Sequence, residues 1–232
     1  MSYIVTISGS PAAQSRSTHL LGAAEQTLQK AGAAVRRINV RELPAAALLH
    51  ADAAHPALRA ALELVEYAQA VVIATPVYKG AYSGLLKTFL DLLPQTALAG
   101  KVVLPIATGG SLAHLLALDY ALKPVISALG ARHVVTSVFG TDREVWWTEA
   151  GGYTLNDEIA ARLAQSTAQL HGVLAEQAEL RTYRLHLSGF TKAVTGVGET
   201  GPAAVLETAH ERNTATRRTG ADVRAHITSI TG

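Results

Sequence analysis

The stretch AVVIATPVYKGAYSGLLK, residues 70–87, combines a buried strand, a loop and the start of a helix. AVVIA is apolar along its whole length, which is typical of a strand covered on both faces of a parallel sheet. Pro76 ends the strand, because proline has no N–H to donate to a neighbouring strand. Gly80 and Gly84 keep the following turn open, and Ser83 is a typical residue to start a helix. The stretch is therefore one strand-to-helix unit of an α/β fold.

The same alternation of apolar runs and helical patterns continues along the chain. Strands are predicted at residues 3–8, 35–40, 70–75, 101–108 and 133–139, and helices at 17–31, 57–68, 83–93, 112–129 and 155–180. Five strands, each followed by a helix, indicate a doubly wound parallel sheet with helices on both faces. The first loop, SGSPAAQSRS, lacks the GxGxxG spacing of a dinucleotide fold, so the five-stranded flavodoxin-like order is favoured.

Residues 1–182 are predicted to form one domain, since the length and the hydrophobic content of 49% suffice for a single core. Residues 183–232 are rich in Thr, Gly and Ala and show no sustained period. We expect a poorly ordered or loosely docked C-terminal extension there, and no function is assigned to it.

The charge balance and the missing cysteines exclude several classes of function. Residues 1–182 hold 14 Lys+Arg and 14 Asp+Glu, so the net charge of +2 comes from residues 183–232, which hold 6 and 4. A neutral body argues against a nucleic-acid groove and against attachment to a membrane surface. Without cysteine, redox chemistry must belong to an organic cofactor, and the nine histidines show no metal-ligand spacing. No export signal or membrane-spanning stretch is recognised, so a cytoplasmic protein is expected.

The first strand-end loop, residues 8–17, suits a phosphate group. A helix N-terminus offers free N–H groups and the positive end of a dipole. The hydroxyls of Ser10, Ser15 and Ser17 and the cation of Arg16 would complete a pocket for a terminal phosphate. The alternative is that these serines only cap the helix.

The second loop, which follows Pro76, suits a planar ring system. The backbone of residues 77–79 can turn out over the sheet edge, and Tyr78 and Tyr82 could stack on a flavin ring or lie at its edge. Alternatively, Tyr82 packs under the loop. Lys87 lies one turn inside the next helix and is expected to be solvated.

The third loop, TGGS at residues 108–111, also suits a flat ligand. Its two glycines allow close approach of the backbone, and their N–H groups can bond the carbonyl-rich edge of a flavin. His114 lies one turn into the next helix, where a histidine is either a structural group or a proton donor. Together, the three loops supply a phosphate site and two walls for a ring, which is what a mononucleotide flavin requires.

These loops resemble those of the NADPH-dependent FMN reductases of flavodoxin-like fold, most densely over residues 3–129. Residues 75–131 are similar to the subgroup that serves two-component alkanesulfonate monooxygenases. The resemblance implies FMN and NADPH as cofactors and no catalytic side chain or metal. It implies phosphate contacts at Ser10, Ser15, Arg16 and Ser17, and further flavin-site residues at Pro76, Val77, Tyr78, Lys79, Ser83, Thr108, Gly109, Gly110, Ser111 and His114.

The subgroup is also known for an extra tyrosine that widens one helical turn at a subunit interface, and Tyr120 is similar to it. Pro124 cannot donate to the carbonyl of Tyr120, so this turn is weakened, and a π-bulge is a plausible relief. The alternative is a plain proline kink with Tyr120 packed in a dimer interface. A homodimer or homotetramer is expected.

The resulting prediction is an enzyme that transfers hydride from NADPH to FMN and supplies reduced flavin to a partner monooxygenase in sulfonate sulfur assimilation. One alternative is a quinone or azo reductase that keeps its flavin bound, and another is a flavodoxin-type electron carrier, which the neutral body disfavours. The sequence leaves the choice between NADPH and NADH open. Residues 142–157, DREVWWTEAGGYTLND, follow no assignable pattern, so Trp146 and Trp147 could cover a neighbouring subunit's flavin or fill an interface.

Overall fold

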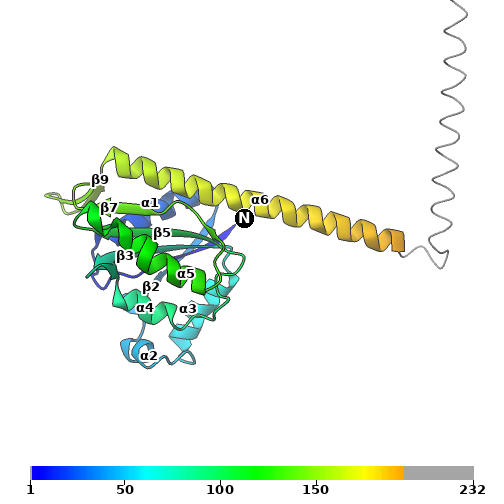
Figure 1. Ribbon diagram of the computed structural model, residues 1–232, viewed down its shortest axis with the longest axis horizontal. Coiled ribbons are helices and arrows are strands. Elements are labelled where there is room, and N and C mark those ends of the chain that lie inside the picture. Colours follow the sequence, from blue (N-terminus) through cyan, green and yellow to red (C-terminus); the bar gives the residue numbers. More distant parts are fainter. Residues whose placement is uncertain (1, 196–232) are drawn as a thin grey trace, which may run out of the picture. The chain divides into compact units, whose positions relative to one another are not determined.

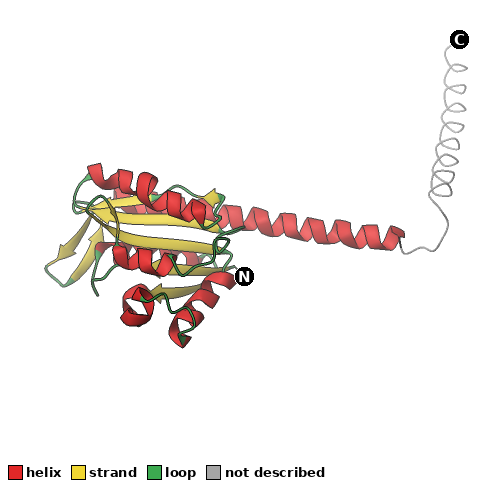
Figure 2. Ribbon diagram, turned by 60° about the horizontal axis from the view of Figure 1, so that its bottom comes forward, coloured by secondary structure: helices red, strands yellow, loops and turns green. Residues whose placement is uncertain are grey.

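The computed structural model describes residues 2–195, with side chains up to residue 187. Met1–Ala178 forms a compact unit of its own and contains the whole sheet. The sheet is parallel apart from one short antiparallel strand, and helices cover both of its faces (Figures 1 and 2). The predicted doubly wound, flavodoxin-like α/β fold is confirmed.

The main strands lie in the order β2 (Ala34–Asn39), β1 (Tyr3–Ser8), β3 (Ala70–Tyr78), β5 (Val102–Gly109) and β6 (His133–Val134). From β1 the chain first adds β2 on one side and then β3 on the other, so the strand order reverses between β1 and β3. Sheets of this kind bind ligands at that point. The short β4 (Ala81–Tyr82) pairs antiparallel with the end of β3. β7 (Val138–Thr141) also pairs with β5, opposite the later residues 106–109, whereas β6 lies opposite residues 102 and 103.

The predicted fifth strand, residues 133–139, is therefore split into β6 and β7. The interruption has a tertiary cause, because the N–H of Thr136 donates to the side chain of Gln169 instead of to β5. Sequence periodicity carries no signal for such a contact from a distant helix.

Successive strand residues point to opposite faces, so the sheet separates two hydrophobic cores. In β3, Val71 and Ile73 pack beneath α3 (Pro56–Tyr67), α4 (Gly84–Leu90) and α5 (Lys123–Ala128). Val72 and Ala74 pack on the other face, beneath α1 (Arg16–Lys30) and α6 (Asp157–Thr195). Figure 1 shows these two helical layers on either side of the strands. Burial on both faces explains why the strands are apolar along their whole length.

The helix predicted over residues 112–129 is present as three pieces. A 3₁₀ turn, η2 (Leu112–Leu115), precedes a π-helical turn, η3 (Leu118–Leu122), and α5 follows. The π-helical turn expected around Tyr120 is thus present, directly before Pro124. Any role of Tyr120 at an interface stays a prediction.

The remaining elements either were not predicted or end at other residues than predicted. η1 (Val40–Glu42) and α2 (Ala45–Leu49) lie in the β2–α3 connection, and β8 (Val145–Thr148) and β9 (Gly152–Leu155) form a hairpin. α6 ends at Thr195, not at Leu180, so the predicted boundary at residue 182 falls inside a helix. Residues 196–232 lie outside the described residues. Within the part of the chain that is described, no helix has the length and apolarity to cross a membrane.

Candidate functional site

The loops after β1, β3 and β5 line one cavity of about 290 Å³. Arg16 from the first loop, Tyr78 from the second and Gly109 from the third all border it. The predicted side chains that line it are Ser15, Arg16, Pro76, Val77, Tyr78, Thr108, Gly109 and Gly110. We call it the flavin cavity, for the ligand predicted from the loops. Three crossings that are far apart in the sequence thus meet at one edge of the sheet, as the sequence predicts.

The first loop ends at the N-terminus of α1, where Ser15 and Arg16 line the cavity. Ser15 is the N-cap of α1, and its Oγ accepts from the N–H of Thr18 at 3.1 Å. The first turn contains no acidic side chain, and among the described residues none accepts from the N–H groups of Arg16 and Ser17. These donors and the helix dipole therefore suit an anion.

Two of the predicted phosphate ligands do not line the flavin cavity. Ser10 and Ser17 are completely buried, and the Oγ of Ser10 accepts from the N–H of Ala12 at 3.2 Å. The Oγ of Ser17 lies 3.2 Å from that of Ser15. In this structure, both side chains stabilise the loop.

Arg16 is held in place by residues near β8 and β9. Its Nε donates to the carbonyl of Val145 at 2.9 Å, and its Nη1 lies 3.2 Å from Oδ1 of Asp142. The guanidinium also lies 5.9 Å from the ring centroid of Tyr153, a cation–π distance. The cation is thus oriented at the cavity without a ligand.

The segment that carries Asp142 and Val145 is fixed by Glu144. The carboxylate of Glu144 accepts from the N–H and the hydroxyl of Thr141, both at 2.8 Å, and pairs with Arg162 of α6. Burial alone would raise the pKa of Glu144, but the hydrogen bonds from Thr141 and the charge of Arg162 outweigh it and lower the pKa.

Ser83 joins the first loop to the second instead of lining the cavity. Its buried Oγ donates to the carbonyl of Gly9 and accepts from the N–H of Leu86 at 3.1 Å, capping α4. Its own N–H donates to Thr75 Oγ1 at 3.0 Å. The loops approach so closely here that a Cβ on Gly9 would lie 2.7 Å from Cβ of Leu86.

The second loop is a tight turn between β3 and β4. The prediction that Pro76 ends the strand is wrong, because β3 continues to Tyr78 and Pro76 lies opposite Thr108 of β5. Lys79 and Gly80 form its tip with φ angles of 53° and 79°, and Lys79 does not line the cavity. Tyr78 is 50% exposed and borders the cavity. Tyr82 packs against the core, and burial raises its pKa. Lys87 is exposed and pairs with Asp91, as expected of a solvated side chain.

The third loop presents its backbone to the cavity. Gly109 and Gly110 line it, whereas Ser111 and His114 lie outside the lining. A Cβ on Gly109 would lie 3.1 Å from Cβ of His114, so His114 packs behind this glycine. His114 is exposed, and its role stays a prediction.

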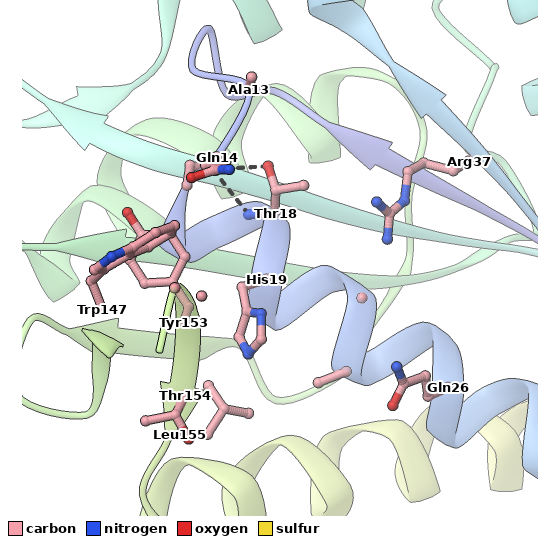
Figure 3. A pocket seen from close by; sticks show the side chains of 15 residues that line it. Ala13, Gln14, Thr18, His19, Gln26, Arg37, Trp147, Tyr153, Thr154 and Leu155 are labelled. Atoms are coloured by element: carbon pink, nitrogen blue, oxygen red, sulfur yellow. Dashed lines mark hydrogen bonds between the residues drawn. The ribbon is translucent and has the colours of Figure 1, made fainter. Parts of the chain in front are cut away.

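A second, larger cavity of about 790 Å³ adjoins the first. Figure 3 shows it between α1 and the β8–β9 hairpin. Gln14, Ser15 and Tyr153 line both cavities. We call it the hairpin cavity.

Sequence reasoning missed four residues of the flavin cavity, namely Ala12, Gln14, Asp142 and Tyr153. The last two lie in the segment without an assignable pattern. A signal was present there, because only EAGG (149–152) separates VWWT (145–148) from YTL (153–155), and a short loop that contains glycine between aromatic and β-branched runs indicates a hairpin.

The fold and this set of loops are those of known reductases. A family model for NADPH-dependent FMN reductases matches residues 2–144. The chain belongs to this family. An FMN reductase (NADPH) from Pseudomonas putida is 46% identical over 175 residues, which are 75% of this chain and 89% of that protein. One from Escherichia coli is 50% identical over 142 residues, 61% of this chain and 74% of that protein.

A solved structure is also similar to this chain. The apo form of an NADH:FMN oxidoreductase (EMOB) is 41% identical and covers 73% of this chain and 88% of its own, with a TM-score of 0.67. The predictions of an NADPH-dependent FMN reductase and of FMN and NADPH as its cofactors are therefore confirmed.

The residues at the flavin cavity fit FMN. An anion site at the start of α1 lies on the same cavity as a partly exposed tyrosine ring and two backbone glycines. A Cβ on Gly110 would stand 3.8 Å from Oδ2 of Asp142, in the space between two cavity walls. These are the kinds of group that bind the phosphate and the ring of a flavin mononucleotide.

Proposed function

We propose that this FMN reductase binds FMN in the cavity formed by its three strand-end loops and releases the reduced flavin to a separate monooxygenase. The observation that carries the proposal is the meeting of Arg16, Tyr78 and Gly109 on one cavity. The proposed downstream process is the assimilation of sulfur from sulfonates.

Bound FMN would accept hydride directly from the nicotinamide ring of NADPH. The protein then needs no nucleophile or general base, and its residues act by orienting the two rings. Ser15, Arg16 and the free N–H groups of α1 hold the phosphate. The backbone at Gly109 and Gly110 and the ring of Tyr78 position the flavin ring.

The ion pair at Arg16 supports a flavin that dissociates. A phosphate must compete with Asp142 for the guanidinium, and it also brings negative charge close to this carboxylate. Both effects weaken the binding of FMN relative to a site with an unpaired arginine. Weak binding suits a flavin that is used as a substrate and favours release over the bound flavin of a quinone or azo reductase.

The proposed partner monooxygenase and the proposed oligomeric state are supported by fewer observations. Residues 75–131 resemble the subgroup that serves alkanesulfonate monooxygenases. Tyr120 in the π-helical turn is 79% exposed, and Leu112 and Leu116 nearby are 64% and 57% exposed. Exposed large apolar side chains within one short segment are a feature of interfaces, which supports a homodimer or homotetramer.

The test is steady-state oxidation of NADPH with free FMN as the varied substrate. The proposal predicts turnover that saturates with FMN and that leaves reduced flavin free to be oxidised by a separate monooxygenase. A purified protein that retains its flavin and reduces quinones faster than FMN would favour the bound-flavin reductase. Absence of NADPH and NADH oxidation would favour an electron carrier. Replacing NADPH by NADH in the same assay decides the nucleotide preference.

A further inference from the structure

The hairpin cavity has one wall of aromatic rings. Tyr153 lies 5.0 Å from Trp147 in an edge-to-face contact and 6.1 Å from His19 in a tilted arrangement, measured between ring centroids. Trp147 is 48% exposed although it borders a cavity. Figure 3 shows these three rings together at one side of the cavity. Such a wall offers stacking surface to a planar ligand.

The opposite wall is polar and carries no free charge. The guanidinium of Arg37 is paired with Glu25 of α1, which also accepts from the hydroxyl of Thr6. On the aromatic wall, burial lowers the pKa of His19, which favours the neutral form of its ring. The side chain of Gln26 is exposed on the polar wall and has both a donor and an acceptor to offer.

These features select the chemistry of the ligand. A phosphate or another anion finds no unpaired cation among the described residues that line this cavity. A planar, uncharged group that forms hydrogen bonds could stack on the rings of Trp147 and Tyr153 and bond to the amide of Gln26. The volume of about 790 Å³ is within the range of small-molecule pockets, roughly 300–1,000 Å³. A purine nucleoside has the required properties.

The position of the hairpin cavity identifies what the nucleoside is attached to. Gln14, Ser15 and Tyr153 border both cavities, and the cation of Arg16 lies beside them. A ligand with one half in the flavin cavity can therefore continue past these residues into the hairpin cavity. FAD and the nicotinamide dinucleotides are molecules of this kind, since each joins a redox-active half to adenosine through a pyrophosphate.

We propose that the hairpin cavity binds the adenosine half of a dinucleotide whose redox-active half occupies the flavin cavity, with Trp147 as the stacking residue. The inference rests on the proposed function, because it takes the flavin cavity to hold the other half. It gives a role to Trp147 but not to Trp146, which lies next to it on β8 and points to the opposite face of the hairpin.

The test is calorimetric binding of two pairs of ligands that differ by AMP, that is, by adenosine and its phosphate. FAD is compared with FMN, and NADH, whose adenosine carries no 2′-phosphate, is compared with reduced nicotinamide mononucleotide. Trp147→Ala is expected to weaken FAD or NADH binding about tenfold, from the usual contribution of one stacked base, and to leave FMN and the mononucleotide unchanged. Trp146→Ala, on the same strand, is the matched control and should change none of the four. Trp147→Phe should restore most of the affinity.

A second variant keeps the inference testable if Trp147→Ala disturbs the hairpin. Gln26→Ala lies on α1 and leaves the β8–β9 hairpin intact, and it should also weaken only the adenosine-containing ligands. A loss for FAD alone, or for NADH alone, identifies which dinucleotide uses the cavity. Equal changes for both members of each pair, or no change for any ligand in either variant, would overturn the proposal. Failure of NADPH turnover with FMN would instead contradict the proposed function.

Discussion

Asp142→Asn should tighten the binding of FMN. The substitution keeps the size of the side chain but removes the negative charge that lies 3.2 Å from Nη1 of Arg16. The guanidinium keeps its bond to the carbonyl of Val145 and its contact with Tyr153, so its orientation is preserved.

The magnitude follows from the exposure of the pair. The side chains of Arg16 and Asp142 are 37% and 47% exposed, so solvent screens their attraction, and such a pair contributes about 1 kcal/mol or less. Release of Arg16 for the phosphate should therefore tighten FMN binding about fivefold. Riboflavin has no phosphate, so its affinity should not change.

Fluorescence titration of FMN and riboflavin measures both affinities in the wild type and the variant. The gain for FMN should shrink as ionic strength rises, because salt screens exposed charges. Asp91→Asn removes a carboxylate that pairs with Lys87 on α4 and serves as the matched control. Equal tightening of FMN and riboflavin, or no tightening of FMN, would refute the placement of the phosphate at Arg16.

Three further variants test how the site is built. Ser83→Ala removes the cap of α4 and leaves the buried carbonyl of Gly9 unpaired, so the free energy of unfolding measured with urea should fall by about 2 kcal/mol; an unchanged midpoint would contradict this role. Gly9→Ala forces a Cβ against Leu86 and should cost about 1–3 kcal/mol in the same assay and weaken FMN binding; a variant as stable as wild type would show that the loops have room to separate. Glu144→Gln loses a carboxylate whose pKa is lowered on folding, so its stabilisation is present above the usual pKa of 4.5 and disappears as the pH falls through the folded value. The stability difference between wild type and this variant should therefore shrink below about pH 4.5 in thermal melts, and a difference that is independent of pH would rule out the charged interaction.

The strand-end loops could be predicted from the sequence because their signals are local. The strand YIVTIS and the helix after Ser15 have the predicted bounds to within one residue. The turn at Lys79 and Gly80 lies close to the predicted glycine, but Pro76 does not end the strand, because β3 continues to Tyr78. Parallel strands end at a common edge, so local signals were sufficient to bring three loops together.

What the sequence did not reveal depends on tertiary contacts. Ser10 and Ser83 are hydroxyl residues in the right loops, but only the fold decides that they bond to backbone instead of facing the cavity. Asp142 belongs to the site because it forms an ion pair with Arg16, which lies far away in the sequence. The β8–β9 hairpin had a turn signal, but its contribution to both cavities follows only from its packing beside α1.

The most direct test of the account is a crystal structure of the protein grown with FMN. The account predicts the phosphate at the N-terminus of α1, in contact with Ser15 and Arg16, and the flavin ring between Tyr78 and the backbone of Gly109. Flavin bound at another surface, or bound here with its phosphate away from Arg16, would contradict it.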